Sequence, residues 1–175
     1  MDNIETLSGL IAKAARKAFL KLFENGEHFY YCVLLTTEEG FSPIISAWSW
    51  EALDRFSNEY SKEDRDAIKW SYADSPYYNF GDEYFNDVRQ AFSNRFTIDQ
   101  LDNISWYREL KYRLNAMELA MKQLDNDGIF DITQPREAVC INVELMPPNF
   151  SNVERALRLN NPQNITDWLN EAAEI

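Results

Sequence analysis

Histidine, cysteine and glycine are scarce in this chain, which has one histidine, two cysteines and five glycines among 175 residues. One imidazole is too few for a histidine-based metal site, and no glycine-rich phosphate loop of the Walker or dinucleotide type is present. The lone His28 follows a helix end and enters a strand-like run, which is typical of a boundary residue. We therefore predict no metal site, no cofactor and no nucleotide chemistry.

Basic residues are few as well, with 17 lysines and arginines against 29 acidic residues and a net charge of −12. A nucleic-acid-binding protein needs a basic surface to neutralise phosphates, so this class is excluded, and anionic membrane surfaces are disfavoured likewise. No apolar run approaches the roughly 20 residues of a membrane-spanning helix. The first residues lack the basic and apolar regions of a secretory signal, and we expect a cytoplasmic protein.

The two cysteines, Cys32 and Cys140, both lie within apolar, strand-like runs. This setting is typical of reduced thiols that pack as small hydrophobic side chains. A disulfide would require the two strands to be neighbours in space, and the sequence does not determine whether they are.

What the chain does have is enough apolar sequence, 45% of its residues, for one core. The pattern predicts a single α+β domain over residues 1–175, with a small antiparallel sheet of about three or more strands packed by several amphipathic helices. The expected strands are 29–37, as the central strand, 41–48, with Pro43 marking an edge, and 138–146. The main expected helices are 4–23, 49–60 with Ser49 as N-cap, 81–96, 105–124, a helix capped by Ser151 and Glu154, and 166–173.

The stretch Lys69–Phe80 is unusual because it holds five aromatic residues in twelve without helix or strand periodicity. One interpretation is that its rings fold over the sheet as a small additional core. The other is that some of them stay exposed, since tryptophan and tyrosine often anchor protein interfaces. The sequence leaves both interpretations open.

Acidic residues surround this stretch, since residues 38–87 carry twelve acidic and four basic side chains, a net charge of −8. Such a field would attract a basic partner. Asp82, Glu83 and Asp87 could also serve acid–base chemistry in a cleft, although a solvated helix face is the commoner role of such pairs. We predict no catalytic residues and a partner-binding site composed of Trp70, Tyr72, Asp74, Tyr77, Tyr78, Asp82, Glu83 and Asp87.

The order of elements and the segment Lys69-Trp-Ser-Tyr-Ala-Asp-Ser-Pro-Tyr77 resemble the bacterial DUF4303 family, most closely over residues 5–90. Ser75 stands where this family often carries a tryptophan. The resemblance supplies no catalytic residues. Many members are similar to small cytoplasmic proteins encoded beside secreted polymorphic toxins, so the resemblance implies a toxin-neutralising immunity protein.

Three hypotheses follow. The leading one is a non-enzymatic acidic binding protein, an immunity protein that blocks the basic surface of a bacterial toxin. The alternative is a regulatory or scaffold module without a toxin partner, and the third is a carboxylate-dependent hydrolase. The sequence names neither the toxin nor the oligomeric state.

Overall fold

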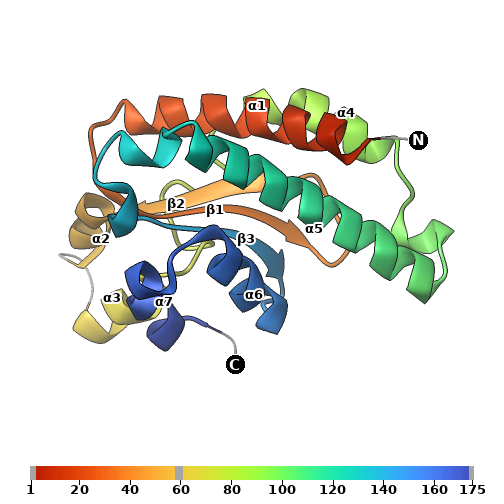
Figure 1. The fold of residues 1–175 in the computed structure, drawn as a ribbon. Helices are drawn as coiled ribbons and strands as arrows, with labels where there is room; N and C mark the ends of the chain where they lie inside the picture. The colour runs from red at the N-terminus through yellow and green to blue at the C-terminus, as the bar shows by residue number, and fades with distance from the viewer. Residues whose placement is uncertain (1–2, 58–60, 174–175) are drawn as a thin grey trace.

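A computed structural model describes residues 3–57 and 61–173 and shows the predicted α+β architecture, a three-stranded sheet between two layers of helices (Figure 1). The strands are β1 (Phe29–Thr37), β2 (Ile44–Ser49) and β3 (Cys140–Met146). The helices are α1 (Ile4–Phe23), α2 (Trp50–Ser57), α3 (Lys62–Ile68), α4 (Asn86–Ser93), α5 (Asn103–Asn126), α6 (Phe150–Leu159) and α7 (Thr166–Glu171). Short 3-10 segments include η1 (Asp82–Phe85) and η2 (Ile98–Gln100) before α5, and η3 (Ile129–Asp131), η4 (Arg136–Ala138) and η5 (Pro162–Ile165) after it.

The strand order is β2-β1-β3, which confirms the predicted central position of β1. β2 pairs antiparallel to β1, but β3 pairs parallel to it, so the sheet is mixed and the expectation of an antiparallel sheet is wrong for this pair. Figure 1 shows the reason, because α5 runs opposite to β1 and returns the chain to the end of the sheet where β1 begins. A helical crossover of this kind is the usual connection between parallel strands.

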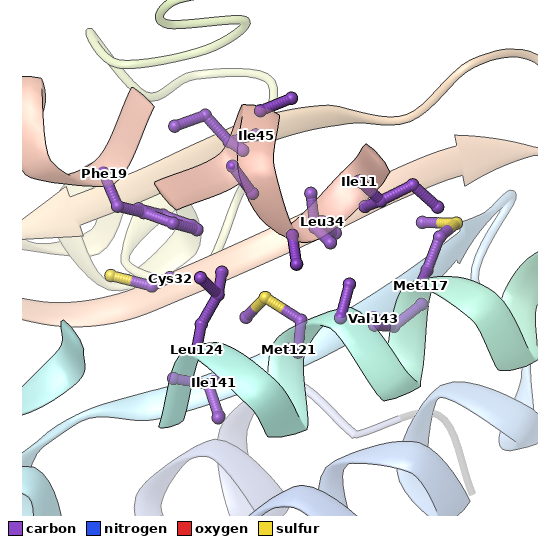
Figure 2. Packing of buried hydrophobic residues seen from close by; sticks show 14 of the residues in the cluster. Ile11, Phe19, Cys32, Leu34, Ile45, Met117, Met121, Leu124, Ile141 and Val143 are labelled. Atoms are coloured by element: carbon purple, nitrogen blue, oxygen red, sulfur yellow. The ribbon is translucent and has the colours of Figure 1, made fainter. Parts of the chain in front are cut away.

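One face of the sheet packs against α1 and α5 and is apolar except for the buried Thr36 near the end of β1. In Figure 2, Phe19 of α1 and Met121 of α5 reach toward the strand side chains around Leu34. The apolar strand residues on this face are Cys32, Leu34, Ile45, Ala47, Ile141, Val143 and Leu145, all of them buried. Burial on this scale is the main favourable contribution to folding. We call this side of the sheet the apolar face.

The opposite face packs against α2, α6, α7 and the stretch Lys69–Phe80. The pairing of the strands determines which residues share this face, because Val33 of β1 pairs with Ser46 of β2 on one side and with Asn142 of β3 on the other. Alternation along the strands then places buried polar groups among apolar ones. The residues on this face, which we call the polar face, are Tyr31, Val33, Leu35, Ser46, Trp48, Cys140, Asn142 and Glu144.

Helix starts follow the predicted capping chemistry with one correction. Ser49 caps α2 as expected, since its hydroxyl accepts a hydrogen bond from the backbone N–H of Ala52 at 3.0 Å. The predicted cap of α6 at Ser151 is wrong, because α6 begins at Phe150 and the side chain of Asn149 accepts from the backbone N–H of Ser151. The helix therefore starts directly after the Pro147-Pro148 pair that ends β3.

The two cysteines lie on neighbouring strands but do not form a disulfide. Cys32 pairs with Ile141, and Cys140 pairs with Tyr31, so the two residues are one step out of register. Because adjacent positions in a strand point to opposite faces, the thiols lie on opposite sides of the sheet. Both are buried, as the sequence predicted.

Candidate functional site

The aromatic stretch covers the free edge of β2 and is fastened there by hydrogen bonds from strand side chains. The indole N–H of Trp48 donates to the carbonyl oxygen of Ser71 at 2.7 Å, and the hydroxyl of Ser46 donates to that of Tyr72 at 2.9 Å. In return, the Ser75 hydroxyl donates to the carbonyl oxygen of Ala47 in β2. An open strand edge is a site of unwanted pairing, so part of this stretch has a structural role.

The stretch passes from one side of the sheet to the other, which divides the predicted partner-binding residues. Trp70 and Tyr72 pack with the core cluster on the polar face, whereas Phe80 packs with the apolar cluster beneath α1 and α5. The end of the stretch lies against α1, since a Cβ at Gly81 (φ 69°) would lie 2.8 Å from Cβ of Ala18. The stretch is therefore not one continuous exposed surface.

Tyr77 is partly buried and fixed in place. Its hydroxyl donates to Oε2 of Glu27 at 2.5 Å, and Arg55 forms an ion pair with the same carboxylate at 2.7 Å. Burial raises the pKa of Tyr77. Burial would also raise the pKa of Glu27, but hydrogen bonds from Ser49 and Tyr77 and the charge of Arg55 lower it overall. This cluster joins the stretch to the turn before β1 and to α2.

Tyr78 is the residue of the predicted set that presents a ring to solvent, with 48% of its surface exposed. The four carboxylates of the set are exposed as well. Asp82 forms an ion pair with Arg89 at 2.6 Å, and Asp74 accepts a hydrogen bond from Ser71. Neither Glu83 nor Asp87 forms an ion pair within the described residues. These acids do not line the cavity described next.

A cavity of about 210 Å³ lies where the first part of the aromatic stretch meets the polar face of the sheet, α6 and α7. Its lining joins two residues of the predicted set, Trp70 and Tyr72, to residues that the prediction missed. Four aromatic rings, one carboxyl and one amide face it: Tyr31, Trp70, Tyr72, Trp168, Glu144 and Asn152. The indole N–H of Trp70 donates to Glu171 of α7 at 2.7 Å, and its ring meets those of Tyr30 and Tyr31 edge-on, which holds the wall in position.

Glu144 is the central group of this cavity, and only 5% of its surface is exposed. Oε1 accepts hydrogen bonds from the Tyr31 hydroxyl and, at 3.3 Å, from the amide of Asn142. Over residues 3–57 and 61–173, no group donates to Oε2 and no lysine or arginine forms an ion pair with the carboxyl. Burial raises the pKa of Glu144, and the hydrogen bonds from Tyr31 and Asn142 and the charge of Arg155 offset only part of this effect. A buried carboxyl without a contacting cation is costly for a fold and is typical of functional sites.

The nearby arginine, Arg155, donates its hydrogen bonds to groups other than Glu144. α6 lies along the free edge of β3, and its polar side chains take the place of a neighbouring strand. The Asn152 amide accepts from the N–H of Leu145 at 2.8 Å and donates to its C=O at 3.1 Å, while Nε of Arg155 donates to the C=O of Val143 at 2.7 Å. Asn160 makes the same pair of bonds to Ile141. These contacts pair the backbone groups at the edge of β3, so the carboxyl of Glu144 faces the cavity without a contact to Arg155.

The prediction from sequence missed Glu144, although a signal for it exists. The third strand alternates strictly between apolar residues and Asn142 or Glu144, and a carboxyl two residues from an amide inside a buried strand is rare. The spacing of Asn152, Arg155 and Asn160 likewise places three long-reaching polar side chains toward one strand edge. Nothing in the sequence shows that Trp70 and Tyr72 would lie beside Glu144, because they are some seventy residues apart along the chain.

Larger hollows lie elsewhere on the described part of the chain. One of about 760 Å³ runs between α1, α5 and α6, and another of about 710 Å³ lies beside Phe41 and Phe96. No group of three or more His, Cys, Asp or Glu side chains that could hold a metal ion was found in the described part of the chain. In the same residues, no helix is both long and apolar enough to cross a membrane.

A family model described as "Domain of unknown function (DUF4303)" matches residues 11–161, which is most of the chain. No curated protein and no solved structure matches it.

Proposed function

The chain belongs to the DUF4303 family, and we propose that it is a non-enzymatic binding protein of the immunity type, which neutralises a bacterial toxin in the cytoplasm by covering a basic surface. The observation that carries the proposal is the exposed ring of Tyr78 in a segment rich in unpaired carboxylates. Aromatic residues supply rigid contact area, and carboxylates around them complement a cationic partner.

The candidate surface consists of Asp74, Tyr78, Glu83 and Asp87, and we call it the acidic surface. All four side chains are exposed, and none of the three carboxylates forms an ion pair within the part of the chain that the structure describes. Uncompensated surface charge contributes little to folding but speeds association with a partner of opposite charge. Trp70 and Tyr77 are less suitable as contact residues because they are hydrogen-bonded into the fold.

The direct experiment is co-purification of the full chain with the product of the neighbouring gene, followed by calorimetry at low and high salt. We expect a tight complex with a protein of high pI, whose affinity falls as salt rises because the charges are screened. If no neighbouring or co-secreted toxin forms a complex, the immunity role is wrong. A complex with a non-toxin partner would instead support the regulatory or scaffold alternative.

Paired variants locate the interface. Glu83→Lys with Asp87→Lys reverses two charges of the acidic surface, and Glu137→Lys with Glu154→Lys reverses two exposed acids on η4 and α6 as a matched control. We expect the first pair to lower the affinity at least about tenfold and to reduce its salt dependence, and the control to change it little. Equal effects of the two pairs would place the interface elsewhere. Tyr78→Ala tests the aromatic contribution by the same measurement.

A further inference from the structure

The cavity beside Glu144 combines a buried carboxyl with aromatic walls, and no cationic side chain among residues 3–57 and 61–173 pairs with this carboxyl. Oε1 of Glu144 is held by Tyr31 and Asn142, which fixes the orientation of the carboxyl. The nearest cationic side chain that influences it, Arg155, donates instead to the backbone of Val143 and to the side chain of Asn152. Since the fold would be served better by an apolar side chain at this position, the carboxyl requires another explanation.

A neighbouring site in the same molecule shows that aromatic rings and a carboxylate together hold an ammonium group. Immediately next to the cavity, Nζ of Lys69 lies 5.0 Å from the ring centre of Trp70 and 5.8 Å from that of Trp50. Oε2 of Glu171 pairs with this ammonium at 2.8 Å. Two indole rings and one carboxylate therefore hold one ammonium group, through cation–π attraction and an ion pair. The Glu144 cavity offers the same kinds of groups without a lysine of the described chain to fill them.

We propose that this cavity binds an alkylammonium group, with Glu144 as the counter-ion and the four aromatic rings as walls. This site is distinct from the acidic surface, so it can fail or succeed independently of the proposed function. Tyr31, Trp70, Tyr72 and Trp168 supply the π-faces and edges. A carboxylate recognises the charge, while the rings favour an amine with apolar substituents over a hydrated metal ion.

The size of the cavity limits the ligand. A cavity of roughly 150 Å³ admits one benzene molecule, so about 210 Å³ suits an amine of four or five carbon atoms. Two sources share this chemistry, a free small amine and the side chain of a lysine in a peptide. Partly exposed Tyr72 and Ala172 and exposed Pro148 lie at the lining, which gives either ligand a way in.

Below the raised pKa of Glu144, binding a cation should release a proton, because the carboxyl must ionise to pair with it. The groups that face Glu144 are Tyr31 from β1, Cys140 from its own strand, Tyr72 from the aromatic stretch and Arg155 from α6. Burial also raises the pKa of Tyr31 and Cys140, so neither competes for the charge near neutral pH. We therefore expect the affinity for an ammonium ion to rise with pH above the ordinary range of a glutamate.

The test is a titration of the full chain with n-butylammonium and with n-butanol, its neutral counterpart of similar shape. Calorimetry reports the affinity, and the indole signals of Trp70 and Trp168 in NMR spectra report the place of binding. We expect n-butylammonium to bind at least about tenfold more tightly than n-butanol and to shift both indole signals. Equal affinity for the two compounds, or unshifted indole signals, would overturn the proposal.

Three variants make the test specific. Glu144→Gln keeps the shape of the neutral acid and should lower the affinity for n-butylammonium at least about tenfold, whereas unchanged affinity would overturn the proposal. Tyr72→Leu, on the partly exposed wall, removes a π-face and should weaken binding several-fold even if the first variant does not fold. Glu118→Gln alters another buried glutamate away from the cavity and should leave the affinity unchanged.

A capped lysine, Nα-acetyl-lysine methylamide, separates the two sources. If a lysine side chain of a protein is the natural ligand, the capped lysine binds at least as tightly as n-butylammonium. If a free amine is the ligand, the backbone of the capped lysine clashes at the entrance and it binds at least about tenfold more weakly. Binding of neither ammonium compound contradicts the proposal.

Discussion

The two faces of the sheet bury different kinds of side chain, although the same three strands form them. The apolar face presents seven buried apolar side chains to α1 and α5. The polar face places Ser46, Asn142 and Glu144 among its apolar residues and lies under the aromatic stretch, α6 and α7. Apolar burial stabilises a fold wherever it occurs, whereas a buried carboxyl without a cation reduces stability. We infer from this difference that the first face contributes most to stability and that the second carries the proposed amine site.

Both open edges of the sheet are covered by side chains. Side chains replace missing strands on both sides, with Ser75 at β2, and with two residues of α6 and its C-cap Asn160 at β3. A three-stranded sheet has two open edges for one central strand, so such covering is needed to prevent pairing with other chains. On the β3 side, Asn152 covers the edge and also lines the cavity, which ties the structural and functional elements together.

The largest expected effect is on the apolar face. Leu34→Ala removes a fully buried side chain from the centre of the sheet and should lower the free energy of unfolding by about 3–5 kcal/mol. Urea unfolding followed by circular dichroism measures the change. A loss below about 1 kcal/mol would show that this face is not the main source of stability.

The next effect concerns the covered edge of β3. Asn152→Ala leaves the N–H and C=O of Leu145 unpaired and should lower the free energy of unfolding by about 2–3 kcal/mol. The exposed Asn115 on α5 gives a matched control, since Asn115→Ala should change stability by less than about 0.5 kcal/mol. If both variants unfold at the same urea concentration, α6 does not protect the edge.

A smaller effect appears in the pH dependence on the polar face. The pKa of Glu144 is raised in the fold, so the native state holds a proton that the unfolded chain releases above its ordinary value of 4.5. Stability of the native chain therefore falls as pH rises from that value through the raised pKa, by at most about 1.4 kcal/mol per pH unit. Glu144→Gln removes this loss, and unfolding measured from pH 4 to 8 should show the variant gaining relative to the native chain.

Glu118 provides the contrast in the same measurement. Burial alone would raise its pKa, but Arg158 and Lys122 lower it overall, so its charge stabilises the fold above its ordinary pKa and is lost as pH falls. Glu118→Gln should consequently destabilise the chain near neutral pH. Parallel pH profiles for the two variants would contradict the distinction between a paired and an unpaired buried carboxyl.

The smallest effect is expected at the acidic surface. Glu83→Lys with Asp87→Lys changes exposed side chains outside both core clusters, and should alter the free energy of unfolding by less than about 1 kcal/mol. Thermal unfolding checks this directly. A large loss would mean that these charges support the fold and are not free for a partner.

Much of the fold could be predicted from the sequence because its periodicities are strong. The stripe from Ile4 to Phe23 and the run 29–37 predicted α1 and β1 with their observed bounds. The direction of β3 could not be predicted, because a strand has the same pattern whether its neighbour is parallel or antiparallel. The sequence left two interpretations of the aromatic stretch open, and the structure shows Trp70, Tyr72 and Tyr77 packed against the core clusters.

The candidate cavity could not be predicted from the sequence, for a physical reason. Its walls come from β1, β3, the aromatic stretch, α6 and α7, and only tertiary packing brings them together. Exposed charges such as Asp82 and Glu83 draw attention in a sequence, whereas Glu144 is hidden within an apolar run.

The most direct test of the central claim measures unfolding of the native chain and of Glu144→Gln, each with and without saturating n-butylammonium. A ligand that binds only the native state stabilises it, by about 2.7 kcal/mol at a hundred times its Kd. The account predicts that the amine stabilises the native chain and not the variant, and that without amine the variant is at least as stable near neutral pH. A variant that is less stable without amine, and that gains as much from it as the native chain, would contradict the account.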